Sequence, residues 1–333
     1  MRHTACRPPN RRTALRALAG CASLSALAGS PALAQDPYPN KSVRIVVPFA
    51  AGGAGDVVTR MVAQRLSVRL GQPFVVDNRP GAGGSIGPAL VARAAPDGYT
   101  LAFISSGYTW LAATYPNLPF HPARELQPVA LICSQPYAVI ARKDAPFKTL
   151  RDFVAYARAN PGKLNFASAG AGTLTHLLPA WLAAEAGISI NHIPFGGTAP
   201  AMNSLVAGQT DVYFDPLSTS KAQLKAGTVQ GLATTGSSRP PSFAELPTLA
   251  ELGFQARGAT WFGFMAPAGV PKALVEKLHQ EINAVLAEDE IRQKLVAMEF
   301  VIEATTVAKF AAFLEQQTAT WGKVIKDNNI KAD

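Results

Sequence analysis

The sequence predicts an α/β fold in which short strands alternate with helices. Short β-branched runs such as Ser42–Val47 are followed by loops of small residues and then by helical segments. In the segment after the first loop, Val58, Val62 and Leu66 recur every four residues, a spacing that places them on one face of a helix. The chain has 333 residues, which is long enough for two domains that each bury a core.

Each strand and helix is predicted from its local pattern. Pro48 ends the first strand, and Gly71 ends the first helix, since glycine readily adopts the left-handed conformation of a helix C-terminus. Thr149 and Asp152 match a capping box. The predicted strands are 42–47, 74–76, 101–104, 129–132, 137–141, 164–167, 188–193, 212–214 and 261–265, and the predicted helices are 56–70, 86–94, 149–159, 174–186, 200–207, 271–288, 290–298 and 306–326. Their alternation predicts parallel strands.

The first 34 residues are typical of an export signal. Five arginines and no acidic residue lie in positions 1–16, an uncharged stretch rich in Ala and Leu follows, and Ala32-Leu33-Ala34 forms a small-x-small cleavage site. A membrane anchor is the alternative, but Gly, Ser and Pro interrupt the apolar run, and a span needs about 20 strongly apolar residues. We therefore expect residues 1–34 to be a cleaved signal peptide and the mature protein to be periplasmic.

The route of export is left open by the sequence. Arg11-Arg12 followed by Leu15 is compatible with twin-arginine export, but adjacent arginines also occur in ordinary signals. Leu18-Ala19-Gly20-Cys21 is similar to a lipobox, whose cysteine would be lipidated. A lipobox follows the apolar region, whereas Arg16 lies only two residues before this motif, so cleavage after Ala34 is favoured.

Removal of the signal changes the charge and the cysteine count. The full chain carries 31 basic and 22 acidic residues, and losing five arginines lowers its net charge from +9 to +4. The remaining basic residues are scattered, so no nucleic-acid partner is expected. Only Cys133 remains of three cysteines, which excludes an internal disulfide, and its apolar surroundings predict a buried side chain.

The loops that follow the strands are the most informative feature for function. Four of them, at 49–55, 81–85, 168–173 and 196–199, consist mainly of Gly, Ala, Ser and Thr. Small residues allow a ligand to approach the backbone, and the free N–H groups and dipole of the next helix favour an anion. Ligands of open α/β sheets lie beyond the carboxyl ends of the strands. Two such loops in each half predict a carboxylate or phosphate in a cleft between two domains.

Other motifs favour no enzyme or cofactor. Gly83-Gly84-Ser85-Ile86-Gly87 matches the Gly-x-Ser-x-Gly hydrolase motif, but none of His121, His176, His192 and His279 has an evident orienting acid. No Walker or dinucleotide-binding glycine loop is present, and no Cys/His cluster has metal-ligand spacing. We therefore expect no cofactor, no metal and no catalytic residue, and an enzyme acting on a small acid stays a weaker alternative.

A series of motifs occurs in order along the chain from about Pro37 to the C-terminus. They are Tyr38-Pro39-x-Lys41, Ile45–Phe49, Gly52-Gly53-x-x-Asp56-x-x-x-Arg60, Asn78–Gly84, Ala95–Leu101, Gly170-x-Gly172-Thr173-x-Thr175-His176-Leu177 and Pro247-Thr248-x-x-Glu251-x-Gly253. Together they resemble the Bug/TctC family of extracytoplasmic solute receptors of tripartite tricarboxylate transporters.

The resemblance implies a two-domain periplasmic-binding-protein-like (Venus flytrap, type II) fold with two crossover strands. We expect residues 35–138 and 262–333 to form domain 1 and residues 139–261 to form domain 2. Similar proteins bind carboxylates through backbone amides and water and deliver them to the membrane permease subunits of a transporter. A periplasmic sensor that docks on a histidine kinase is the alternative, and the resemblance does not name the solute.

The resemblance also implies which residues line the ligand site. The residues carried over are Phe49, Gly52, Gly53, Asp56, Ser105 and Ser106 in domain 1, and Ser168, Gly170, Gly172, Thr173, His176, Gly197, Thr198, Ala199 and Asp215 in domain 2. Several have structural explanations as well. Asp56 could only cap its helix, His176 could be a packed helix residue, and the two serines could be ordinary loop residues. Trp261 is expected to pack at a crossover rather than to touch ligand.

Two positions bear on specificity. Asp215 is the best candidate, because an acid beside a bound carboxylate needs a donor such as a ligand hydroxyl, an ammonium group or water. The family often has an aromatic residue followed by Lys-Gly after the proline near position 194, whereas this chain has Phe195-Gly196-Gly197. The missing lysine leads to the hypothesis that this protein favours a less anionic or more apolar solute.

Overall fold

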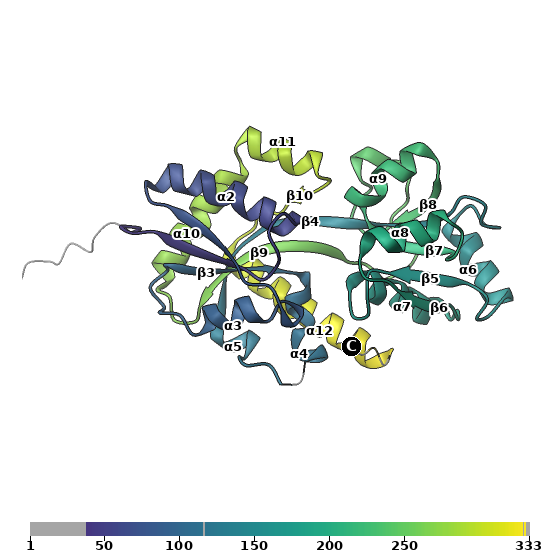
Figure 1. Cartoon of the computed structure of the whole chain (residues 1–333), viewed down its shortest axis with the longest axis horizontal. Helices are drawn as coiled ribbons and strands as arrows, with labels where there is room; N and C mark the ends of the chain where they lie inside the picture. The colour runs from purple at the N-terminus through teal and green to yellow at the C-terminus, as the bar shows by residue number, and fades with distance from the viewer. Residues whose placement is uncertain (1–37, 116, 329, 331–333) are drawn as a thin grey trace, which may run out of the picture. The chain divides into compact units, whose positions relative to one another are not determined.

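The computed structural model describes residues 38–115, 117–328 and 330. The predicted signal peptide and its cysteines lie outside them. From Lys41 onward the chain forms one compact unit built on a mixed sheet with the strand order β2-β1-β3-β9-β4-β7-β5-β6 (Figure 1). The domain boundaries within this unit stay a prediction. No helix among the described residues is both long and apolar enough to cross a membrane.

The first half of the sheet carries the two predicted βα units. Its strands are β1 (Val43–Val47), β2 (Phe74–Asn78), β3 (Thr100–Ser105), β9 (Ala259–Pro267), β10 (Val301–Ile302) and the first part of β4 (Leu126–Arg142). The β1 strand pairs in parallel with β2 and β3, as the sequence pattern predicts. Helices α2 (Ala54–Leu70) and α10 (Lys272–Leu286) pack against each other, and α3 (Ile86–Ala92) and α12 (Val307–Asp327) lie on the other side of the sheet (Figure 1).

The strand β4 differs from the prediction. The sequence suggested two strands at 129–132 and 137–141, but a single strand runs from Leu126 to Arg142. Its first part pairs with β9, and its last residues pair with β7 (Val212–Pro216) and β8 (Val229–Thr234). Pairing with a neighbouring strand holds the segment 133–136 extended, which a local pattern cannot reveal. The two halves of the sheet are thus joined along β4, with β9 beside it.

The second half of the sheet adds β5 (Asn165–Ser168) and β6 (Asn191–Pro194) to β7 and β8. The apolar face formed by Val139, Phe166 and Phe214 packs on α6 (Leu150–Ala159) and α7 (Leu174–Ala186). The opposite face packs on α8 (Thr198–Val206) and α9 (Leu217–Ala226). Thr149 and Asp152 form the predicted capping box of α6. Both faces of these strands are covered, as expected for an α/β sheet.

Shorter elements and the C-terminal helix complete the fold. The 3₁₀ segments η1 (Ala82–Gly84), η2 (Ser106–Trp110) and η3 (Pro241–Phe243) and the helices α4 (Leu111–Thr114), α5 (Pro122–Glu125) and α11 (Asp289–Ala297) complete the described elements. The indole of Trp321 on α12 packs edge-on against those of Trp110 and Trp181. Because Trp181 belongs to α7, the C-terminal helix contributes to the core of both halves.

Candidate functional site

The ends of strands from both halves surround a cavity of about 680 Å³, here called the cleft. This volume lies within the range of small-molecule sites, roughly 300–1,000 Å³. The loop after β1, the η1 segment, the η2 and α4 segments and the start of α7 contribute its walls. The residues are Pro48–Ala51, Gly53–Gly55, Gly83, Gly84, Pro88, Ile104–Tyr108, Trp110, Leu111, Thr114, Tyr115, Tyr137, Ala171–Leu174, Thr260 and Phe262.

Two helices of different halves begin at the wall of the cleft. Gly53 is the N-cap of α2 and Thr173 is the N-cap of α7, and both are extended. Neither side chain caps its helix: Gly53 has none, and the Thr173 hydroxyl donates instead to the Gly170 carbonyl oxygen at 2.7 Å. The first N–H groups of an α-helix have no intrahelical partner. The cleft therefore meets two sources of partial positive charge in the backbone.

Three of the predicted glycine amides already have internal acceptors. The N–H of Gly52 donates to Asp56 Oδ2 at 2.9 Å, that of Gly170 to Ser168 Oγ at 3.2 Å, and that of Gly172 to His176 Nδ1 at 3.2 Å. These bonds fix the shape of the two loops. The backbone groups left to meet a ligand are those at the first turns of α2 and α7.

Asp56 organises the first loop. Its side chain is 3% exposed, and its two oxygens accept hydrogen bonds from Gly52 N–H, Arg60 Nε and Asn78 Nδ2 at 2.9–3.0 Å. Burial raises the pKa of this carboxyl, but these hydrogen bonds outweigh burial and lower the pKa to about 2. Asp56 is therefore ionised and holds the loop in place rather than capping α2 at its N-cap position.

A pair of stacked histidines supports the second loop. The rings of His176 and His192 lie 3.7 Å apart between centroids at 15°, and His192 Nε2 is 2.6 Å from Ser168 Oγ. Because His176 Nδ1 accepts from Gly172 N–H, this ring is neutral with its proton on Nε2. Burial, with the charge of His192, lowers the pKa of His176 to about 4. Its position matches the interpretation as a packed helix residue that supports the loop.

The structure brings only part of the predicted set to the wall of the cleft. Phe49, Gly53, Ser105, Ser106, Gly172 and Thr173 line it. The residues that lie outside its wall are Gly52, Asp56, Ser168, Gly170, His176, Gly197, Thr198, Ala199 and Asp215. Of these, the side chains of Asp56, Ser168 and His176 accept hydrogen bonds from the backbone amides of the loops that line the cleft. Direct contact of any of the fifteen with a ligand stays a prediction.

Asp215, the predicted specificity residue, is fully buried in β7. Its Oδ2 accepts from the Thr219 hydroxyl at 2.6 Å, while its Oδ1 is buried without a hydrogen bond. Burial raises the pKa of this carboxyl to about 7. Asp215 therefore takes up a proton more readily than an exposed acid does.

Five aromatic residues of the cleft wall, in addition to the predicted Phe49, were not predicted from the sequence: Tyr108, Trp110, Tyr115, Tyr137 and Phe262. Among the described residues that form this wall, none is Asp, Glu, His, Lys or Arg. The sequence features that could have indicated this wall are the glycine-rich motif 81–84 and the aromatic-rich stretch 108–115. They are separate in sequence, and whether they lie together depends on the tertiary fold.

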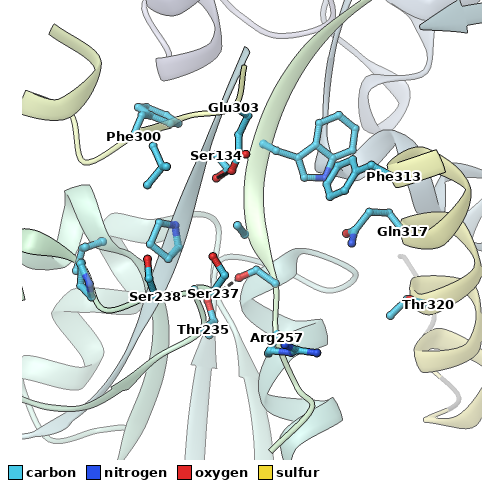
Figure 2. A pocket seen from close by; sticks show the side chains of 18 of the residues that line it. Ser134, Thr235, Ser237, Ser238, Arg257, Phe300, Glu303, Phe313, Gln317 and Thr320 are labelled. Atoms are coloured by element: carbon cyan, nitrogen blue, oxygen red, sulfur yellow. Dashed lines mark hydrogen bonds between the residues drawn. The ribbon is translucent and has the colours of Figure 1, made fainter. Parts of the chain in front are cut away.

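A larger cavity of about 1,280 Å³, here called the hinge cavity, lies along β4 and β9. Figure 2 shows Ser134, Glu303 and Phe300 on one side of it and Phe313, Gln317 and Thr320 of α12 on the other. Its wall contains nine charged residues and none of the fifteen predicted site residues. Trp261, expected to pack at a crossover, is 1% exposed there and packs edge-on against Phe310 and Phe313.

A family model described as "Tripartite tricarboxylate transporter family receptor" matches residues 58–330. The chain belongs to this family. The resemblance seen in the sequence motifs is thereby confirmed, and because the family consists of solute receptors, the chain is a receptor rather than an enzyme. One relative is the "UPF0065 protein in tcbD-tcbE intergenic region" of Pseudomonas sp. (strain P51), 36% identical over 96% of this chain and 95% of that protein.

Solved structures of the family show the same fold. An R. palustris protein solved with adipate is 32% identical, covers 89% of this chain and 100% of its own, and has a TM-score of 0.75. MatC from Rhodopseudomonas palustris with bound malate is 31% identical, covers 86% and 100%, and has a TM-score of 0.71. The predicted periplasmic-binding-protein-like fold is confirmed by these receptors. Within the described residues, no group of His, Cys, Asp and Glu is placed to hold a metal.

Proposed function

We propose that this receptor binds a small organic carboxylate in the cleft, through backbone amides at the starts of α2 and α7 and through water. The observation that carries the proposal is that two uncapped helix N-termini, one from each half, line a cavity whose described wall contains no Asp, Glu, His, Lys or Arg. Helix N-termini bind anions through their N–H groups and dipole. The family and the adipate and malate bound to its relatives support the same class of ligand.

The proposed role is delivery of this solute in the periplasm to the membrane subunits of a tripartite tricarboxylate-type transporter. The N-terminal sequence pattern and the family support export and a transport role. Binding would draw the two halves together by a hinge motion at β4 and β9, because a ligand that contacts both halves favours the closed state. None of the relatives described above points to a sensor kinase.

A thermal-shift screen of the purified protein against carboxylates tests the proposal. A ligand that binds only the native state raises the melting temperature by mass action. We expect at least one small organic acid to stabilise the protein, while its amide or alcohol counterpart at equal concentration does not. Equal effects of an acid and its amide would contradict a carboxylate site.

A further inference from the structure

We infer that the solute is a monocarboxylate with an aromatic body rather than a di- or tricarboxylate. This inference rests on the proposed function and names the class of ligand for the same cleft. It is carried by the described residues that line the cleft, which include six aromatic side chains and no Asp, Glu, His, Lys or Arg.

The aromatic residues come from separate elements that converge on the cleft. Phe49 follows β1, Tyr108 and Trp110 lie on η2, Tyr115 follows α4, and Phe262 lies on β9. The hydroxyls of Tyr108 and Tyr137 are already bonded, to the Pro122 carbonyl oxygen and to Thr260 Oγ1, both at 2.7 Å. The rings therefore offer mainly faces and edges, which favour stacked or edge-on contact with another ring.

Close packing on glycines shows that part of this wall is built around its rings. A Cβ on Gly83 would lie 2.3 Å from Tyr115 Oη, and a Cβ on Gly55 would lie 2.9 Å from the Phe103 ring. Phe103 in turn packs edge-on against Phe49, with centroids 6.2 Å apart. These glycines allow aromatic rings of the protein to pack against the backbone. The sequence pattern instead suggested that the small residues let a ligand approach.

A second carboxylate on the solute would lack a partner here. When both helix N-termini hold the same carboxylate, the rest of the described wall offers no cation for a second one, and burying an unpaired charge is costly. This composition of the wall favours a solute with one negative charge and an apolar remainder.

Isothermal titration calorimetry with the purified protein tests the inference. The probes are benzoate, phenylacetate and 3-phenylpropionate as aromatic monocarboxylates, and adipate, malate and citrate as polycarboxylates. We expect the best aromatic acid to bind at least tenfold more tightly than any polycarboxylate. Tyr115→Ala should weaken its binding at least fivefold, while Tyr156→Ala, at a half-buried tyrosine of α6 outside the cleft, should leave it unchanged.

Each outcome separates the inference from the proposed function. Tighter binding of adipate, malate or citrate would overturn the aromatic class and leave the carboxylate receptor standing. Unchanged affinity of an aromatic acid for folded Tyr115→Ala, with an unaltered melting temperature, would also overturn the aromatic wall. Absence of binding by all six acids would contradict the proposed function itself.

Discussion

The cleft and the hinge cavity are both lined by residues of the two halves, but their chemistry differs. The cleft of about 680 Å³ is lined by glycines, hydroxyl side chains and aromatic rings, whereas the hinge cavity of about 1,280 Å³ has nine charged residues in its wall. Many of these charges are already paired within the protein. Glu299, for example, is 8% exposed and accepts from both Lys221 Nζ and Ser242 Oγ.

The larger volume and the greater number of charged residues do not make the hinge cavity the better candidate for the solute site. An ion pair at the hinge cavity ties the two halves together, since Glu299, just before β10, accepts from Lys221 Nζ of α9. The cleft instead has backbone N–H donors at the starts of two helices. Hydrogen bonds to the side chains of Asp56 and His176 hold its loops in place. This contrast supports the proposal that the cleft recognises the solute while the hinge cavity connects the two halves.

Substitution of Gly53 is expected to have the largest effect on binding. Its φ of −73° suits any residue, and the nearest atom to an added Cβ is 3.8 Å away, so Gly53→Leu keeps the fold and fills the cleft at the start of α2. We expect a roughly 100-fold loss of affinity, or about 2.7 kcal/mol, measured by calorimetry. Gly322→Leu, on α12, where an added Cβ has no other atom within 4 Å outside its own helix backbone, is the control. Unchanged affinity of Gly53→Leu would remove α2 from the site.

Gly172 is a less suitable target than Gly53. Its φ of +71° lies in the left-handed region, so Gly172→Val would strain the loop as well as block the cleft. Loss of binding in that variant would not separate a damaged loop from a blocked site, whereas Gly53→Leu leaves the backbone unstrained.

Acidification is expected to weaken the loop that carries Gly172. The pKa of His176 is lowered to about 4 in the folded chain, against 6.5 for an ordinary histidine. Between these values the unfolded chain binds more protons at this ring, so the contribution of His176 to the free energy of unfolding falls as the pH drops from 6.5 to 4, by on the order of 1 kcal/mol for a partly exposed ring. The raised pKa of Asp215 acts in the opposite direction over the same range, so the test is a comparison: in denaturant unfolding, wild type should lose more stability, or gain less, on acidification than His176→Gln. An identical pH dependence in both proteins would contradict the role of this ring.

The hinge cavity is expected to matter for stability and not for affinity. Glu299→Ala removes a buried carboxylate and leaves Lys221 unpaired, so we expect the free energy of unfolding to fall by about 2 kcal/mol. Glu315→Ala, on the exposed face of α12, should change it little. Solute affinity measured on the folded Glu299→Ala protein should equal that of wild type, and a tenfold change would move recognition toward the hinge cavity.

A cation placed in the cleft is expected to change its preference. Thr114 lines the cleft on α4 and is half-buried, so Thr114→Arg offers a guanidinium to a second carboxylate. We expect adipate to bind about tenfold more tightly than to wild type, a gain near 1.4 kcal/mol. Thr149→Arg is unsuitable as a control because Thr149 caps α6, so Thr228→Arg, on the exposed loop before β8, serves instead. No gain in adipate affinity would contradict the missing-cation argument.

Local patterns predicted most of the strand-and-helix order, but helix α9 and strand β8 were missed. Gly71 and the Thr149–Asp152 capping box lie where their helix ends require them. The continuity of β4 was missed because pairing with β9 holds it straight. Gly53 and Thr173 were predicted at the site from their loops, whereas the aromatic wall was missed, since contacts such as Gly83 with Tyr115 arise only when the chain is folded.

The most direct test is a crystal structure of the protein with the carboxylate that stabilises it most in the thermal-shift screen. We predict that the carboxylate lies in the cleft, within hydrogen-bond distance of backbone N–H groups at the start of α2 or α7 and unpaired with any Lys or Arg. A carboxylate bound in the hinge cavity, or held by an arginine or lysine side chain, would contradict it.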